Sequence, residues 1–184
     1  MPQFVVLLRG VNVGKGNRVP MAAFRSLLEA QGFSEVRTLL NSGNAVFRSA
    51  ARSAAQHAKT IGARLEESLG VSVLVVVKPS AEFLIAVAEN PFAFPEKDHS
   101  RLLVAFAQND VAVHTLSALL PLLQPPERLH VASHAAYLYC ANGILESKVG
   151  TALLGKRGRE VTTRNWATVL KLKALLGQRP VPPN

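Results

Sequence analysis

The stretch FVVLLRGVNVGKGNRVP, residues 4–20, sets the course of the first half of the chain. Phe4–Leu8 is an uninterrupted apolar run with the length of one buried strand. Pro20 then opens a segment whose apolar side chains recur at helical spacing. Between these two segments, Arg9–Arg18 carries three glycines and three basic side chains. The stretch therefore predicts a strand, a cationic turn and a helix, in that order.

The remainder of the first half predicts a compact α+β unit. Asn41-Ser42-Gly43-Asn44 is a strong hairpin signal, because asparagine and glycine tolerate positive φ. The expected elements are strand 4–9, helix 20–31, strands 36–40 and 45–48, helix 53–69 and strand 72–78. This β-α-β-β-α-β order is typical of the ferredoxin-like plait, in which both helices cover one face of an antiparallel sheet.

The second half begins to repeat the same order. The expected elements are helix 80–89, a linker with Pro91 and Pro95, strand 102–107, helix 111–123, a hairpin of 129–132 and 136–141, a short helix within 145–154, a brief strand near 159–161 and a last helix, 163–176. We therefore predict two tandem ferredoxin-like units (βαββαβ, an α-β plait) with antiparallel sheets, the second less complete. The expected boundaries are 1–78 for the first unit, 79–100 for a helix and linker, 101–176 for the second unit with the C-terminal helix, and 177–184 for a tail.

Three strands show no polar alternation, which predicts that both faces of each sheet are covered. They are Phe4–Leu8, Val73–Val77 and Leu102–Phe106. The longest apolar run near the start is too short to span a bilayer, and the single cysteine, Cys140, has no partner for an internal disulfide. We accordingly expect a soluble cytoplasmic protein that does not enter membranes.

Charge indicates the kind of partner. The formal net charge of +9 favours anionic molecules over cationic ones. In the predicted plait the end of the first strand and the hairpin 41–44 share one end of the sheet, so Arg9–Arg18 should meet that hairpin. We predict a site for a phosphate- or carboxylate-bearing metabolite or nucleotide at loops 9–18 and 41–44. Its residues are Arg9 and Lys15 for charge, with Asn12, Asn41, Ser42 and Asn44 for hydrogen bonds.

These two loops contain no carboxylate, which argues against a hard-cation metal site there. The spacing of Gly10, Gly14 and Lys15 does not match a P-loop, and Val19 stands where a dinucleotide fingerprint needs glycine. None of the five histidines has a companion that predicts a catalytic dyad. The sequence identifies no catalytic residue, no cofactor and no oligomeric state.

A second group of polar residues lies near the C-terminus and holds the only tryptophan. A threonine is expected to cap the last helix, which would leave Arg164 and Asn165 in its first turn, followed by Trp166. The helix dipole disfavours an arginine there, which hints at ligand binding. The alternative is that Trp166 packs in the core and Arg164 meets a structural acceptor.

Two other function classes stay open. The basic stretch from Lys156 to Arg179 suits a nucleic-acid-associated protein held by phosphate contacts, although residues 44–48 do not match the aromatic pattern of RNA-binding sheets. A structural module for protein interaction is the third class. Salt dependence of binding separates nucleic-acid binding from a small-ligand site.

Five segments together resemble bacterial domain-of-unknown-function family 1697. They are 7–14 (LLRGVNVG), Pro20-Met21, 40–44 (LNSGN), Asn90-Pro91-Phe92 and 163–169 (TRNWATV). The resemblance implies two ferredoxin-like α/β units in one chain, and it implies no activity, substrate or cofactor. Ala167 stands where the family pattern often has a polar residue.

Overall fold

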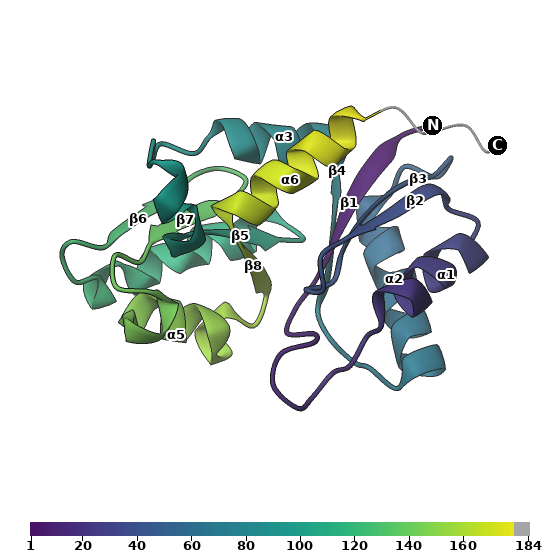
Figure 1. Ribbon diagram of the computed structural model, residues 1–184, viewed down its shortest axis with the longest axis horizontal. Helices are drawn as coiled ribbons and strands as arrows, with labels where there is room; N and C mark the ends of the chain where they lie inside the picture. The colour runs from purple at the N-terminus through teal and green to yellow at the C-terminus, as the bar shows by residue number, and fades with distance from the viewer. Residues whose placement is uncertain (179–184) are drawn as a thin grey trace. The chain divides into compact units, whose positions relative to one another are not determined.

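The computed structural model describes residues 1–178 of the chain (Figure 1). It contains two compact units. Among the described residues, the first unit is Met1–Ser80 together with Lys171–Gln178, and the second unit is Ala81–Leu170. Each unit holds one four-stranded antiparallel sheet, so the fold is mixed α/β.

The first unit follows the element order expected from the sequence. Its elements are β1 (Gln3–Leu8), α1 (Met21–Ala30), β2 (Ser34–Leu39), β3 (Asn44–Arg48), α2 (Ala54–Leu69) and β4 (Val75–Pro79). The strands lie in the order β2-β3-β1-β4, with every neighbouring pair antiparallel. Helices α1 and α2 lie together on one face of this sheet (Figure 1).

Local sequence signals explain the ends of α2. The Ser53 hydroxyl accepts a hydrogen bond from the Gln56 N–H at 3.2 Å, which caps the first turn. Gly70 ends the helix in the left-handed conformation, with φ 63°. The strand expected from residue 72 begins only at Val75.

Both faces of the central strand β1 are buried. Phe4, Val6 and Leu8 point into the core beneath α1 and α2. On the opposite face, Val5 and Leu7 are at most 1% exposed. This two-sided burial accounts for the absence of polar alternation in the strand.

The second unit repeats the strand order of the first. Its elements are α3 (Ser80–Ala88), η1 (Glu96–Arg101), β5 (Leu102–Ala107), α4 (Asp110–His114), η2 (Thr115–Leu122), β6 (Arg128–Val131), β7 (Ala136–Tyr139), η3 (Ile144–Glu146), α5 (Lys148–Leu154), η4 (Lys156–Gly158) and β8 (Val161–Asn165), followed by α6 (Trp166–Gly177), which ends in the first unit. The sheet order is β6-β7-β5-β8. Phe83 of α3 stacks on Phe106 of β5 at 5.3 Å between ring centroids, while Leu103 and Ala105 face the core on the other side.

Two expected elements of this unit differ from those observed. The single helix predicted for 111–123 is a short α-helix followed by a 3-10 helix, and Pro121, which has no N–H to donate, lies in the last turn of the 3-10 segment. The brief strand expected near 159–161 is instead the five-residue strand β8, so the second sheet has as many strands as the first.

Within residues 1–178, no helix combines the length and the apolar character needed to cross a membrane. Of the predicted tail 177–184, Gly177 closes α6, and residues 179–184 lie outside the described part of the chain.

Candidate functional site

The loop after β1 and the hairpin between β2 and β3 meet, as their places in the sheet require. The Leu8 N–H donates to the Gly43 carbonyl at 2.9 Å. The Asn12 side-chain amide donates to the Asn41 carbonyl at 2.7 Å. Two segments about thirty positions apart in the sequence therefore form one polar surface at this end of the first unit.

Asn12 is the residue that fixes the loop. Its Oδ1 accepts from the Val19 N–H at 2.9 Å, and its Nδ2 donates to the Val19 carbonyl at 2.8 Å as well as to Asn41. Its own N–H donates to the Asn17 carbonyl at 3.0 Å. The side chain is therefore occupied in joining the loop to itself and to the hairpin.

The hairpin contributes a position that only glycine fits. Gly43 has φ 78°, and a Cβ there would lie 2.7 Å from both Leu8 Cβ and Val11 Cγ2. Next to it, Asn44 is fully buried, and its Nδ2 donates to the Leu39 carbonyl and to the Ser42 hydroxyl. Asn44 thus has a structural role, whereas Asn41 and Ser42 are exposed.

Three basic residues border the loop. Arg9 is half-buried, and burial lowers the pKa of its guanidinium from the usual value. Lys15 is exposed at the tip of the loop. The Arg18 guanidinium donates to the Gly14 carbonyl at 2.6 Å, which holds a positive charge against the turn.

The backbone of the loop has an unusual pattern of φ angles. Gly10, Asn12 and Gly14 have φ of 62°, 55° and 60°, whereas the residues between them do not adopt positive φ. Where left-handed residues alternate with right-handed helical ones, successive N–H groups turn toward one side and can bind an anion. Within the described residues, no hydrogen bond uses the N–H groups of Val13, Gly14 or Lys15.

The second predicted group of residues lies in the second unit, and its expected place in a helix is wrong. Arg164 and Asn165 belong to strand β8, where Arg164 pairs with Val104. Arg164 is therefore not in the first turn of a helix, and the hint of ligand binding that depended on that position is wrong. The Arg164 guanidinium donates at 2.8 Å to the Thr162 hydroxyl and at 2.8 Å to the Thr163 carbonyl, and burial lowers its pKa to about 10.

Asn165, and not a threonine, caps α6. Its Oδ1 accepts from the Thr168 N–H at 2.9 Å. Trp166 is the first residue of the helix and is partly buried. The polar groups of Arg164 and Asn165 thus have structural partners within the second unit.

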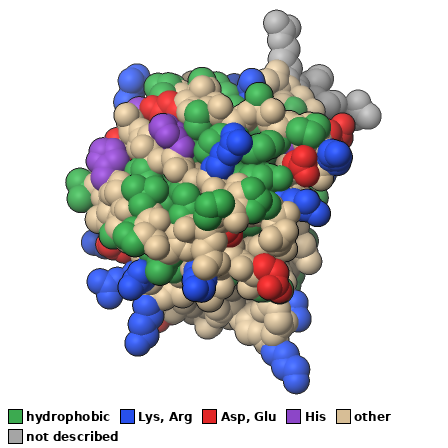
Figure 2. Space-filling model, turned by 90° about the vertical axis from the view of Figure 1, so that its left-hand side faces the viewer, with side chains coloured by type: hydrophobic (Ala, Val, Ile, Leu, Met, Phe, Trp, Pro, Cys, Tyr) green, Lys and Arg blue, Asp and Glu red, His purple; other side chains and the backbone are tan. Residues whose placement is uncertain are grey.

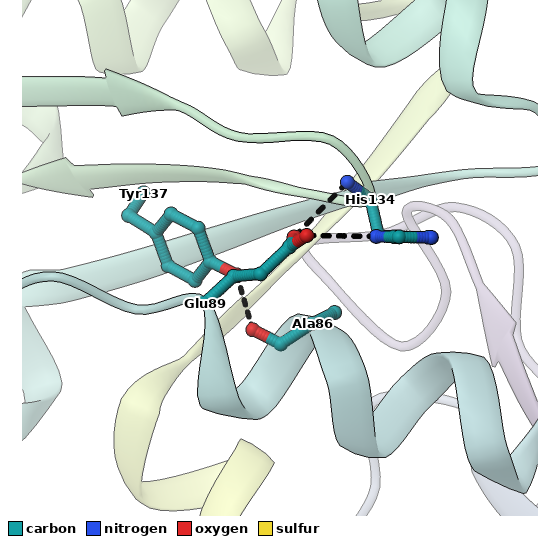
Figure 3. A network of polar contacts seen from close by, with 4 residues as sticks. All are labelled: Ala86, Glu89, His134 and Tyr137. Carbon is teal, nitrogen blue, oxygen red and sulfur yellow. Dashed lines mark hydrogen bonds and ion pairs between the residues drawn. The ribbon is translucent and has the colours of Figure 1, made fainter.

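One polar pair escaped the sequence analysis. His134, in the turn between β6 and β7, directs its Nδ1 to Glu89 Oε1 at 2.9 Å, and its backbone N–H donates to Glu89 Oε2 at 3.1 Å (Figure 3). The two residues are 45 positions apart, so no local spacing pointed to them. Within residues 1–178, no cluster of three or more His, Cys, Asp or Glu side chains could hold a metal ion.

Comparison with known proteins identifies the family. A sequence model of the family described as "Protein of unknown function (DUF1697)" matches residues 1–137, about three quarters of the chain. The chain belongs to this family. The resemblance inferred from the five sequence segments is thereby confirmed.

A solved structure extends the DUF1697 comparison over nearly the whole chain. The conserved bacterial protein SP0830 from Streptococcus pneumoniae is similar, with a TM-score of 0.73 and 26% sequence identity over 95% of this chain and 98% of that one. No curated protein matches the chain. The family and its structural relative thus describe the fold, and the chemistry must be argued from the residues.

Proposed function

We propose that this protein binds a small anionic molecule, one that carries a phosphate or carboxylate group, at loops 9–18 and 41–44. The proposal depends above all on the adjacent N–H groups of Val13, Gly14 and Lys15, which have no acceptor within the described residues. Backbone N–H groups in such a turn, combined with cationic side chains, are the usual elements of phosphate sites. The absence of any carboxylate from the two loops suits the same ligand.

The predicted residues divide into two roles under this proposal. Asn12 and Asn44 hold the loop and hairpin in place through backbone contacts. Lys15 supplies the charge at the tip, and Arg9 adds charge at the base. Asn41 and Ser42, which are exposed beside Asn12, orient the ligand by hydrogen bonds.

The face shown in Figure 2 has no continuous basic stripe. Its Lys and Arg side chains are separated from one another and are interspersed with Asp and Glu side chains. Nucleic-acid binding through backbone phosphates works best with a continuous basic stripe. The nucleic-acid and protein-interaction hypotheses therefore serve as alternative outcomes of the test.

The test is a thermal-denaturation titration with inorganic phosphate, pyrophosphate and citrate, each against sodium chloride at equal ionic strength. At least one of the three anions should raise the Tm of the wild type. Lys15→Ala should weaken that anion about tenfold, since a charged hydrogen bond contributes roughly 1.5 kcal/mol. Lys59→Ala removes another exposed lysine, from α2 of the same unit, and should change nothing.

Equal loss in both variants, or no shift with any anion, would refute the proposal. Binding to DNA or RNA at low salt that falls steeply as salt rises would replace it with the nucleic-acid hypothesis. The role predicted for Arg164, Asn165 and Trp166 is tested in the same titration by Trp166→Phe. An unchanged titration curve would remove that group from the site.

We also infer that each unit is a ferredoxin-like plait and that the protein is cytoplasmic. The β-α-β-β-α-β order of the first unit and the matching strand orders β2-β3-β1-β4 and β6-β7-β5-β8 support the inference about the fold. The single cysteine supports the inference about the compartment.

A further inference from the structure

The carboxylate of Glu89 is held in one position by its neighbours. Both of its oxygens accept hydrogen bonds from His134, one from the ring and one from the backbone (Figure 3). About three quarters of each side chain is buried. Because a carboxylate only accepts hydrogen bonds, the proton of the imidazole must lie on Nδ1.

A hollow of about 480 Å³ lies beside this carboxylate, within the second unit. Its walls come from Glu89, from His114 and Ser117 after β5, and from His130 and Val131 of β6 with residues 132 and 133 of the following turn. The hollow is a depression that is wide open to solvent. Its volume falls within the range of small-molecule sites, and the Glu89 carboxylate is a fixed polar group at its edge.

The charge of this hollow is the opposite of what the whole chain suggests. The chain has a formal net charge of +9, yet the lining contains one carboxylate and no Lys or Arg. Glu89 also follows the C-terminal end of α3, where the helix dipole adds partial negative charge. Burial and the charge of Glu89 raise the pKa of Tyr137, whose hydroxyl donates to the Ala86 carbonyl (Figure 3). Such a field disfavours anions.

The lining groups are those that complement hydroxyl groups. An ionised carboxylate accepts about four hydrogen bonds, and His134 supplies two of them. The hydroxyls of Ser117 and Ser133 and the imidazoles of His114 and His130 each donate and accept. A ligand hydroxyl can donate to Glu89 and accept from these neighbours, whereas a phosphate would bring its negative charge against the Glu89 carboxylate.

We propose that this hollow is a second binding site, for a neutral, hydroxyl-rich molecule of monosaccharide size. The turn that carries Ser133 and His134 joins β6 to β7, as the hairpin 40–43 joins β2 to β3 in the first unit. The two sites thus occupy equivalent ends of two sheets with the same strand order. The first site would take an anion and the second a neutral molecule.

The test is a titration of ¹⁵N-labelled protein with glucose, myo-inositol, putrescine and inorganic phosphate, followed by amide chemical shifts. At least one of the two polyols should shift the amides of residues 131–133 in a saturable manner. Glu89→Gln should weaken that binding at least fivefold, and Glu146→Gln, an exposed carboxylate of the same unit, should leave it unchanged. Ser117→Trp should abolish it by filling the hollow without touching the Glu89–His134 pair.

The experiment tests the hollow separately from the first-unit site, because phosphate bound at the first-unit loop shifts amides 10–18 instead of amides 131–133. Absence of polyol shifts at 131–133 overturns the proposal. So does putrescine or phosphate binding there in place of polyols, since either would require a different ligand class. Should Glu89→Gln fail to fold, the Ser117→Trp result by itself supports or refutes the site.

Discussion

The two units share one strand order but differ in the connection that follows their first strand. Twelve residues, Arg9–Pro20, separate β1 from α1, whereas only Gln108 and Asn109 separate β5 from α4. The second unit demonstrates that two residues suffice to make this turn. The additional length in the first unit therefore exceeds what the scaffold needs, and surplus loop on a rigid sheet is where binding sites are commonly found.

The hairpin turns of the two units are held in different ways. In the first unit, Asn12 and the close fit of Gly43 tie the hairpin 40–43 to the long loop. In the second unit, Glu89 ties the turn 132–135 to the end of α3 through His134. The same corner of the fold thus carries amide and cationic groups in one unit, and a carboxylate with imidazoles in the other.

The largest expected effect comes from the residue that ends each turn. Gly43→Ala should lower the free energy of unfolding by about 2–4 kcal/mol, because the new Cβ meets Leu8 and Val11 at a positive φ. Ala135 holds the equivalent place before β7 and has no positive φ. Ala135→Gly should cost only about 1 kcal/mol. Urea unfolding followed by circular dichroism measures both, and equal costs would contradict the asymmetry between the turns.

A smaller effect is expected from the side chain that fixes the long loop. Asn12→Gly keeps the left-handed backbone available but removes three side-chain hydrogen bonds, at a cost of about 2 kcal/mol. Asn17→Gly is the matched control, since Asn17 has φ 48° and its side chain makes one long hydrogen bond of 3.4 Å. Its cost should stay below about 1 kcal/mol. Similar costs for the two variants would mean that Asn12 does not hold the loop.

The sequence predicted much of the fold because local signals agreed with one another. Ser53 and Gly70 mark the ends of α2, and a hairpin turn joins β2 to β3 at residues 40–43, one position before the expected 41–44. The error near the C-terminus has a physical reason. Residues 162–169 (TTRNWATV) contain β-branched residues, a capping asparagine and a helix start in direct succession. The capping residue could not be chosen without knowing that Arg164 pairs with Val104 in the sheet.

The site was less predictable than the fold. Topology brought the two loops of the first unit together, but the division between exposed polar residues and residues with structural partners required the actual hydrogen bonds. Asn12 and Asn44 look like ligand residues in the sequence, and both have backbone partners. The Glu89–His134 pair had no sequence signal, since it depends on how α3 packs on the second sheet.

A smaller effect on stability is expected at alkaline pH, and it originates in the second unit. The cysteine and both tyrosines of the chain lie in the second unit. Burial is the main reason why the pKa of Cys140 is raised from 9.0 to about 11. The charge of Glu127 raises this pKa as well, whereas a hydrogen bond from Ser147 lowers it. The folded thiol stays neutral while the unfolded one ionises, so this contribution to stability is complete below pH 9 and is lost as the pH rises toward 11. At pH 10 the loss of stability should be about 1 kcal/mol.

Urea unfolding at pH 7.5 and pH 10 measures this loss, and Cys140→Ala should show a correspondingly smaller drop in the free energy of unfolding. An identical drop in the variant would mean that the thiol is not protected by the second core, and the alkaline sensitivity would then rest on Tyr137, whose pKa is raised in the same direction.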